Sequence, residues 1–222
     1  MVKDYYIGTE KALFVAKKMK AELVHNMAIA EGTSLTFIET KTLIDDKVSI
    51  AGKNTDDIEQ VLRLAHGWDE IILQVQRAIF NLSKENFIRI NSLIAIKEAL
   101  KVGDFRHAQV YIGDYTPPMA QQLEQCFEQM ENELSKQEDI FKKASDIFLI
   151  AARNQYFYDG NKRTAQLMMN GFLMSHGYAP RSIQQKYLPE YNEKMMEFYH
   201  TNNKEDMYAF FAKIANSKRY TI

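Results

Sequence analysis

The residues of this chain that are best suited to chemistry lie in one polar loop between two apolar helical patterns. The loop spans residues 155–165 and reads Gln-Tyr-Phe-Tyr-Asp-Gly-Asn-Lys-Arg-Thr-Ala. Gly160 and Asn161 stand where the downstream helical pattern begins. The first N–H groups of a helix have no acceptor within that helix, and the helix dipole adds partial positive charge at this end. The spacing therefore predicts a helix entrance that binds an anion.

Three charged side chains add to this entrance. Lys162 and Arg163 supply cationic donors, which bind phosphate oxygens well. Asp159 supplies a carboxylate oxygen, the type of ligand that Mg²⁺ prefers. The residue types by themselves thus indicate a phosphate-binding site beside a carboxylate that is suited to a metal ion.

Helices on both sides must position this loop. The upstream apolar residues recur at helical spacing: Ile140, Phe141, Ala144, Ile147, Phe148, Ala151 and Ala152. The downstream ones do the same and stop before Gly177 and Pro180: Ala165, Met168, Met169, Phe172 and Leu173. Gln155 continues the apolar face of the upstream helix, so its amide needs a polar partner. Two partners stay open, namely the loop itself, which Gln155 would brace, or a bound phosphate.

The rest of the chain is also predicted to be helical. Apolar periodicity indicates helices at 9–30, from Thr36 through Ile44, 55–79, 83–100, 119–134, 189–199 and 205–215. Thr9 and Ser83 are expected to cap two of these helices, and Thr36 with Glu39 has the spacing of a capping box. Leu100 is expected to face inward, and Met168, Met169 and Met174 are expected to fill the core. The segment 105–115 lacks this period. Its Val110, Tyr111 and Ile112 favour a strand, and Gly113-Asp114 favours a turn. We therefore predict an all-α bundle with one short β-hairpin.

Composition bounds the function classes. The 222 residues are 46% apolar and 26% charged, which is typical of a globular protein. The formal net charge of −1 gives no reason to expect a nucleic-acid or membrane partner. No apolar run is as long as a membrane span, and no signal-peptide pattern is present. Cys126 is the one cysteine, which excludes an internal disulfide and fits a reducing compartment, so we expect a cytoplasmic location.

The loop resembles the signature of Fic/Doc (Fido-domain) proteins, His-x-Phe-x-Asp-(Gly/Ala)-Asn-(Gly/Lys)-Arg. The matching residues are Phe157, Asp159, Gly160, Asn161, Lys162 and Arg163. The position of the catalytic histidine holds Gln155 instead. The resemblance implies a Fido-type helical bundle, with residues 1–82 as an N-terminal helical extension and residues 83–222 as the Fido domain. It also implies that the hairpin at Val110, Tyr111 and Ile112 is a flap, which holds a segment of a target protein as an added strand.

The extension contains a second similarity. Residues 27–32 are similar to the family's inhibitory motif, Ser/Thr-x-x-x-Glu-(Gly/Asn), with Met27 at the Ser/Thr position. The resemblance makes Glu31 the regulatory residue. The inhibitory glutamate normally pairs with a second arginine, and that position holds Gln166 here. Two alternatives remain for Glu31: an ion pair with Lys162 or Arg163, or a solvated position at the helix end.

The family transfers part of a nucleotide, most often AMP from ATP, to a Ser, Thr or Tyr hydroxyl of a protein. The resemblance gives the catalytic positions as Gln155, Asp159 and Arg163, and the nucleotide-binding positions as Gly160, Asn161, Lys162 and Arg163. Asp159 would hold Mg²⁺. Lysine at position 162 is similar to the death-on-curing branch, which transfers a phosphoryl group, so the transferred group stays open.

The amide of Gln155 has no useful pKa and cannot act as a general base. Loss of such a base costs a factor of roughly 10²–10⁴ in rate. We therefore expect a protein that binds ATP or another nucleotide with Mg²⁺, with protein adenylylation weak or lost. The alternatives are an active nucleotidyl- or phosphoryl-transferase and a catalytically dead module that docks a peptide at the flap. Whether the chain forms a homodimer stays open.

Overall fold

The structure is a computed structural model, and it describes residues 6–48, 50–97 and 99–216. The helices of the described chain are α1 (Thr9–Lys18), α2 (Lys20–Ala30), α3 (Phe37–Lys41), α4 (Thr55–Gln76), α5 (Lys84–Ile94), α6 (Leu123–Lys136), α7 (Ile140–Asn154), α8 (Asn161–Ser175), α9 (Leu188–Thr201) and α10 (Glu205–Asn216). A π-helical turn at Thr42–Asp46 continues α3, and 3₁₀ turns at Ala120–Gln122 and Gln185–Tyr187 precede α6 and α9. The predicted all-α class is confirmed.

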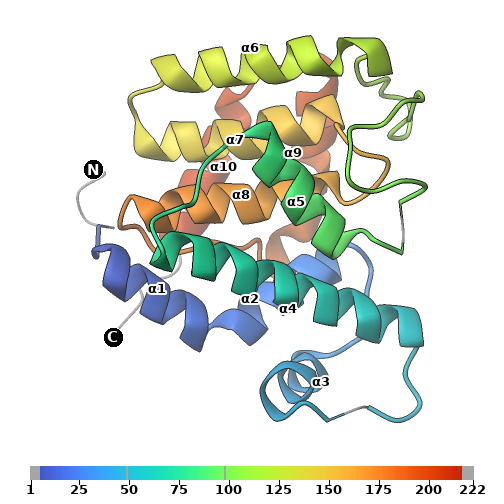
Figure 1. Ribbon diagram of the computed structural model, residues 1–222, viewed down its shortest axis with the longest axis vertical. Coiled ribbons are helices and arrows are strands. Elements are labelled where there is room, and N and C mark those ends of the chain that lie inside the picture. Colours follow the sequence, from blue (N-terminus) through green and yellow to red (C-terminus); the bar gives the residue numbers. More distant parts are fainter. Residues whose placement is uncertain (1–5, 49, 98, 217–222) are drawn as a thin grey trace.

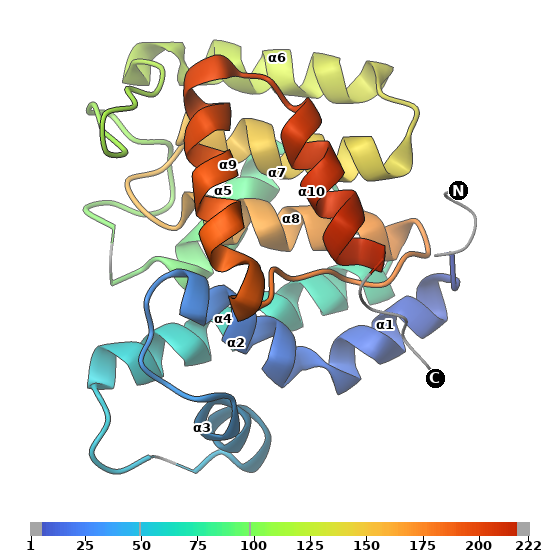
Figure 2. The ribbon, with the colours of Figure 1, turned by 180° about the vertical axis from the view of Figure 1, so that it is seen from behind.

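Helix α8 lies at the centre of the bundle, and its residues from Arg163 to Met174 are all buried. Helix α7 packs along one side of α8, while α4, α5 and α1 contact it from others. Helix α6 lies beyond α7 (Figure 1). Seen from behind, α9 and α10 cover the central pair (Figure 2). The 155–165 loop therefore joins the two most central helices, and burial on several sides fixes where its ends lie.

The predicted N-terminal helix is two helices. The chain breaks at Met19, whose φ and ψ are −101° and 9°, and both α1 and α2 then pack against α4. Gly8, with φ 85°, is the N-cap of α1, so the expectation that Thr9 caps this helix is wrong. The break sets the direction of α2 independently of α1. As a result, α2 ends beside the loop between α7 and α8.

Side-chain caps explain where other helices begin. The capping box of Thr36 and Glu39 is present at the start of α3, and Ser83 accepts a hydrogen bond from the N–H of Asn86 at the start of α5. Both caps were predicted. Helix α5 ends at Ile94, however, so Leu100 lies beyond it and is 84% exposed rather than directed inward.

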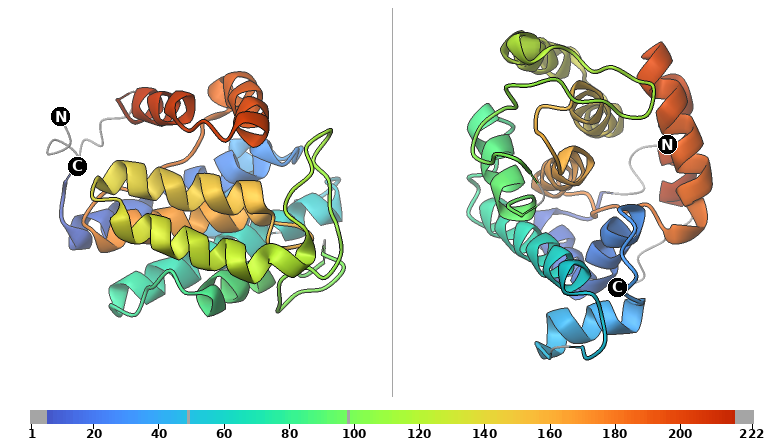
Figure 3. Two further views of the ribbon diagram at one scale, coloured as in Figure 1. Left: turned by 90° about the horizontal axis from the view of Figure 1, so that it is seen from above. Right: turned by 90° about the vertical axis from the view of Figure 1, so that its right-hand side faces the viewer.

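The predicted β-hairpin is not formed. In the described chain, the segment contains one isolated antiparallel bridge, between Ile112 and Tyr115. Its main chain is instead held by side chains: Gln109 Nε2 donates to the carbonyl oxygens of Val110 and Pro117. Residues 117 and 118 are prolines, which have no N–H to extend a strand pair. We keep the name flap for residues 105–118, which lie at the same end of the bundle as the 155–165 loop (Figures 1 and 3).

Candidate functional site

The 155–165 loop is shaped by two residues in the left-handed region. Gln155 ends α7 with φ 49°, and Gly160 precedes α8 with φ 74°. Glycine is required at the second position for space as well as conformation. A Cβ on Gly160 would lie 2.9 Å from the Cβ of Ala95 and 3.0 Å from Nδ2 of Asn91. The helix entrance is thus pressed against the end of α5.

This close approach gives a stability prediction. Gly160→Ala should reduce the free energy of unfolding by about 2–4 kcal/mol, because backbone strain at positive φ adds to a collision in a packed region. Gly52→Ala is the matched control, since Gly52 has φ 75° and nothing within 4 Å of the added Cβ. That control should cost only about 1–2 kcal/mol. Urea denaturation of both variants measures the two losses in the free energy of unfolding. Equal losses would show that neighbouring residues move aside and relieve the collision at position 160.

Gln155 braces the loop from inside. Its side chain is buried, its Nε2 donates to the carbonyl oxygen of Ala152 at 2.6 Å, and its Oε1 accepts from Nδ2 of Asn161 at 2.9 Å. Asn161 in turn clamps Phe157, whose carbonyl oxygen and N–H it bonds at 2.8 and 2.9 Å. The sequence left two partners open for the Gln155 amide, the loop itself or a bound phosphate. In this structure the amide bonds the loop and the end of α7. Gln155 also lines the cleft described below.

Asp159 and Arg163 form an ion pair across the first turn of α8. Oδ1 of Asp159 accepts from Nη2 of Arg163 at 2.9 Å and from the N–H of Gly160. The Arg163 side chain is 3% exposed and that of Asp159 is 43% exposed. The Gly160 N–H, expected to be available to an anion, is therefore engaged by the neighbouring carboxylate in this structure. A metal ion can still reach that carboxylate from solvent.

Glu31 reaches the same helix entrance from α2. Its Oε1 lies 3.1 Å from Nζ of Lys162, and its Oε2 lies 3.9 Å from Nε of Arg163. The Glu31 side chain is only 19% exposed. Of the alternatives that the sequence left for this glutamate, the structure shows the ion pair rather than the solvated position.

These residues surround a cleft of about 240 Å³. Its walls contain Glu31, Gln155, Asp159, Gly160, Asn161 and Lys162 together with Ile112, Tyr158, Tyr191, Asn192, Met195, Met196 and Tyr199. The flap thus contributes Ile112, while Tyr111 is 69% exposed and Val110 offers its carbonyl oxygen to Gln109. A polar floor at the start of α8 faces a mainly apolar and aromatic wall from α9.

Two tyrosines of that wall were not singled out from the sequence. Burial, and then the nearby charge of Glu31, raise the pKa of Tyr199, and burial likewise raises the pKa of Tyr191. Both therefore keep their phenolic protons. The Tyr199 hydroxyl is buried and has no hydrogen-bond partner within the described residues. Buried polar atoms in proteins are rarely left in that condition, so this hydroxyl is a donor suited to a bound ligand.

Two buried side chains that sequence reasoning missed hold the loop in place. Asn91 on α5 donates from Nδ2 to the carbonyl oxygen of Asp159 at 2.9 Å and to Oγ1 of Thr164 at 3.1 Å. Arg106 of the flap donates from Nε to the carbonyl oxygen of Gln155 at 2.6 Å. Neither belongs to a periodic pattern that indicates such a role. A polar residue amid apolar spacing on α5 was the only available signal for Asn91.

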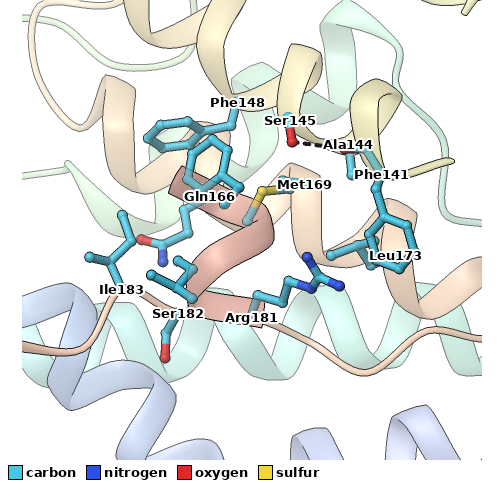
Figure 4. A pocket seen from close by; sticks show the side chains of 12 residues that line it. Phe141, Ala144, Ser145, Phe148, Gln166, Met169, Leu173, Arg181, Ser182 and Ile183 are labelled. Atoms are coloured by element: carbon cyan, nitrogen blue, oxygen red, sulfur yellow. Dashed lines mark hydrogen bonds between the residues drawn. The ribbon is translucent and has the colours of Figure 1, made fainter. Parts of the chain in front are cut away.

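Gln166 does not face the cleft. It lines a separate cavity of about 20 Å³ between α7, α8, α10 and residues 181–183, where Figure 4 shows it among Phe148, Met169 and Ile183. A side chain at position 166 thus points to the other side of α8. Glu31 therefore finds its cationic partner at Lys162. The methionines on α8, including Met169, fill the core as expected.

Within the described residues, no group of three or more His, Cys, Asp and Glu side chains is arranged to hold a metal ion. A metal ion at Asp159 would thus have at most one further ligand among the described His, Cys, Asp and Glu side chains. Such an arrangement fits Mg²⁺, which commonly binds one or two carboxylates together with phosphate oxygens and water. In the same part of the chain, every helix is too short or too polar to cross a membrane.

Comparison with known proteins supplies the family. Residues 81–173 match the model of the Fic/DOC family, a range that contains α5, the flap, α7 and the 155–165 loop. Residues 81–173 form a Fic/DOC domain. The chain is 27% identical over 211 residues to a protein adenylyltransferase Fic of Aedes aegypti, and 28% identical over 211 residues to one of Nematostella vectensis. Each match covers 90% of this chain.

Solved structures agree on the fold. Fic-1 of C. elegans (residues 134–508 of that protein) superimposes with a TM-score of 0.80 over 90% of this chain and 61% of the other, at 17% identity. A Fic domain containing signaling protein of Bacteroides thetaiotaomicron gives a TM-score of 0.69 over 85% of this chain and 74% of the other, at 22% identity. The chain spans only 40% and 47% of the lengths of the Aedes and Nematostella relatives.

Proposed function

We propose that this Fic/DOC protein binds the phosphate groups of a nucleotide, ATP or another, in the cleft at the start of α8. One observation carries the proposal: Asp159, Gly160, Asn161 and Lys162 line one cleft at a helix N-terminus. Asn161 and Lys162 begin the helix, so their N–H groups lack a carbonyl partner within it. The adenylyltransferase names of the relatives favour ATP.

Each residue then has a defined role. Lys162 and Arg163 bind phosphate oxygens, in place of the carboxylates of Glu31 and Asp159 that they contact in this structure. Asp159 holds Mg²⁺, which neutralises phosphate charge when it is bound. The Tyr199 hydroxyl donates a hydrogen bond to the part of the nucleotide that reaches the α9 wall.

Transfer of the nucleotide to a protein hydroxyl is weak or lost in this proposal. Both polar atoms of the Gln155 side chain are engaged in bracing the loop, and an amide cannot accept the hydroxyl proton. The alternative, an active nucleotidyl- or phosphoryl-transferase, is favoured by one fact. Phosphoryl-type transfer depends mainly on positioning and charge stabilisation, which the cleft supplies without a base.

We also propose that residues 1–82 act as an extension that regulates the Fic/DOC domain through Glu31. The glutamate contacts the two cations that the phosphates require.

Glu31→Gln should therefore raise the affinity for Mg·ATP by about 3–10-fold, because two cations lose a competing charge that is only partly screened. Glu39→Gln, which removes another ion-paired glutamate of the same extension, should leave the affinity unchanged within twofold. Equal changes in both variants would contradict a specific role for Glu31.

Calorimetric titration with ATP, with and without Mg²⁺, tests the proposed function. The wild-type chain should bind Mg·ATP in the range of roughly 1 μM to 1 mM, as is usual for nucleotide sites in enzymes. Asp159→Ala should remove the dependence on Mg²⁺, and Lys162→Ala should weaken binding about tenfold, because one charge-assisted contact is lost.

Lys41→Ala is the matched control, since Lys41 is also a partly exposed lysine paired with a carboxylate. Its affinity for Mg·ATP should equal that of the wild type. Absence of binding at millimolar Mg·ATP would refute the proposed function. Binding by Asp159→Ala with an unchanged dependence on Mg²⁺ would refute the assignment of the metal ligand alone.

A further inference from the structure

We propose that Arg106 is a positioning residue that ties the flap to the 155–165 loop, so that nucleotide binding at the loop also orders the flap. The inference deepens the proposed function and rests on it. It concerns a residue that touches neither the phosphates nor the metal ion in that proposal. Arg106 is absent from the lining of the cleft and is 1% exposed.

Arg106 makes two contacts with the loop. Its backbone N–H donates to the carbonyl oxygen of Tyr156 at 2.8 Å, and its Nε donates to the carbonyl oxygen of Gln155 at 2.6 Å. Gln155 is the residue with φ 49° at which α7 ends. The guanidinium therefore fixes the peptide group where the loop leaves the helix, next to the side chain that braces Asn161.

The same guanidinium closes the base of the flap. Nη1 donates to the carbonyl oxygen of Ala108 at 2.8 Å, and Nη2 donates to the carbonyl oxygen of Pro118. Ala108 lies near the start of the flap and Pro118 at its end. The planar guanidinium presents its donors in a fixed geometry, so one side chain spaces three separate chain segments relative to one another.

Burial makes this arrangement cooperative. Each of these bonds ends on a main-chain carbonyl oxygen, and burial lowers the pKa of the Arg106 guanidinium. A buried charge that loses one acceptor keeps its desolvation cost without compensation. The loop and the two ends of the flap are therefore held together in one arrangement, and loosening one segment loosens the others.

Gln109 provides an internal comparison. Its side chain also bridges the flap, from Val110 to Pro117, with bonds of 3.1 and 2.9 Å. Both acceptors belong to the flap, whereas those of Arg106 lie in the flap and in the loop. Loss of Gln109 should thus loosen the flap only, and loss of Arg106 should loosen both segments.

Hydrogen–deuterium exchange of the full chain tests the coupling. Exchange is followed in peptides that cover residues 107–118 and 155–162, without ligand and with millimolar Mg·ATP. In the wild type, Mg·ATP should slow exchange in both segments. In Arg106→Met, exchange without ligand should rise at least tenfold in both segments, and Mg·ATP should protect the loop without protecting the flap. Gln109→Ala should show faster exchange in the flap alone and keep its affinity for Mg·ATP within twofold.

Arg106→Lys covers the case in which Arg106→Met does not fold. Lysine keeps the charge but cannot span three carbonyl groups, so it should fold and still show uncoupled protection of loop and flap. The proposal would be overturned if exchange in the loop were unchanged in both Arg106 variants. It would also be overturned if Mg·ATP still protected the flap in these variants. If the wild type does not bind Mg·ATP, the proposed function fails, while the comparison without ligand still decides whether Arg106 couples the two segments.

Discussion

The double variant Gln155→His, Glu31→Gly is expected to transfer AMP from ATP to protein about 10²–10⁴-fold faster than the wild-type chain. The expected gain is the usual contribution of a positioned general base. Histidine at position 155 would bring an imidazole, whose pKa lies near neutrality, to a residue that lines the cleft. Removal of Glu31 frees Lys162, whose Nζ lies 3.1 Å from the glutamate in this structure. The measurement is incorporation of label from α-labelled ATP into the chain itself and into proteins of a lysate.

Three controls make this result specific. Gln155→Asn keeps an amide and should stay at the wild-type rate. Gln155→His with Asp159→Ala should lose the gain, since the carboxylate proposed to hold Mg²⁺ is absent. Glu31→Gly by itself separates relief of the Lys162 contact from supply of a base. If the wild type already labels protein and Asp159→Ala abolishes that labelling, the chain is an active transferase. If the double variant binds Mg·ATP but adds no label, loss of the base is not what limits transfer.

Trp68→Ala is expected to reduce the free energy of unfolding by about 3–5 kcal/mol, the usual cost of truncating a buried tryptophan. Trp68 is fully buried on α4, and its Nε1 donates to Sδ of Met27 on α2 at 3.2 Å. Glu31 follows Met27 by four residues, so α2 carries it to the cleft from this anchor. We therefore also expect the Glu31–Lys162 contact to weaken, with a rise in Mg·ATP affinity toward that of Glu31→Gln.

Circular dichroism during urea denaturation is the suitable measurement, because Trp68 is the only tryptophan and its fluorescence is lost with it. Trp68→Phe is the control, since it keeps an aromatic ring and loses the N–H donor. Trp68→Phe should reduce the free energy of unfolding by about 1–2 kcal/mol, because it loses one hydrogen bond and a small part of the buried side-chain volume. A cost below 1 kcal/mol for Trp68→Ala would mean that α2 is held to α4 by other contacts.

The sequence by itself predicted those helices for which the apolar periodicity and the cap residues indicate the same stretch of chain. Helix α7 follows the apolar periodicity of its own residues, and α3 begins with the capping box of Thr36 and Glu39. The 155–165 loop was predicted for the same reason, since turn chemistry, helix start and charge all lie within a few consecutive residues. Such features depend on near neighbours in the chain, and they survive any tertiary arrangement.

The flap could not be predicted in this way. Val110, Tyr111 and Ile112 have the β-branched and aromatic side chains of a strand, yet a strand needs a partner. The side chains of Arg106 and Gln109 bond the main chain of this segment instead, and only the bridge of Ile112 and Tyr115 remains. Competition between side-chain and main-chain partners is decided by what is nearby in space.

Tertiary structure also decided how the charges of the site are arranged. The sequence placed Lys162 and Arg163 at a helix entrance, and it left open whether Glu31 meets them. The break at Met19 and the packing of α2 on α4 bring that glutamate within 3.1 Å of Lys162. Position 166 was matched by spacing to a second arginine, but the helix turns Gln166 into the cavity beside α10. Residue types and local spacing thus identified the chemistry, whereas pairing of charges depended on segments more than a hundred residues apart, which only the packed core brings together.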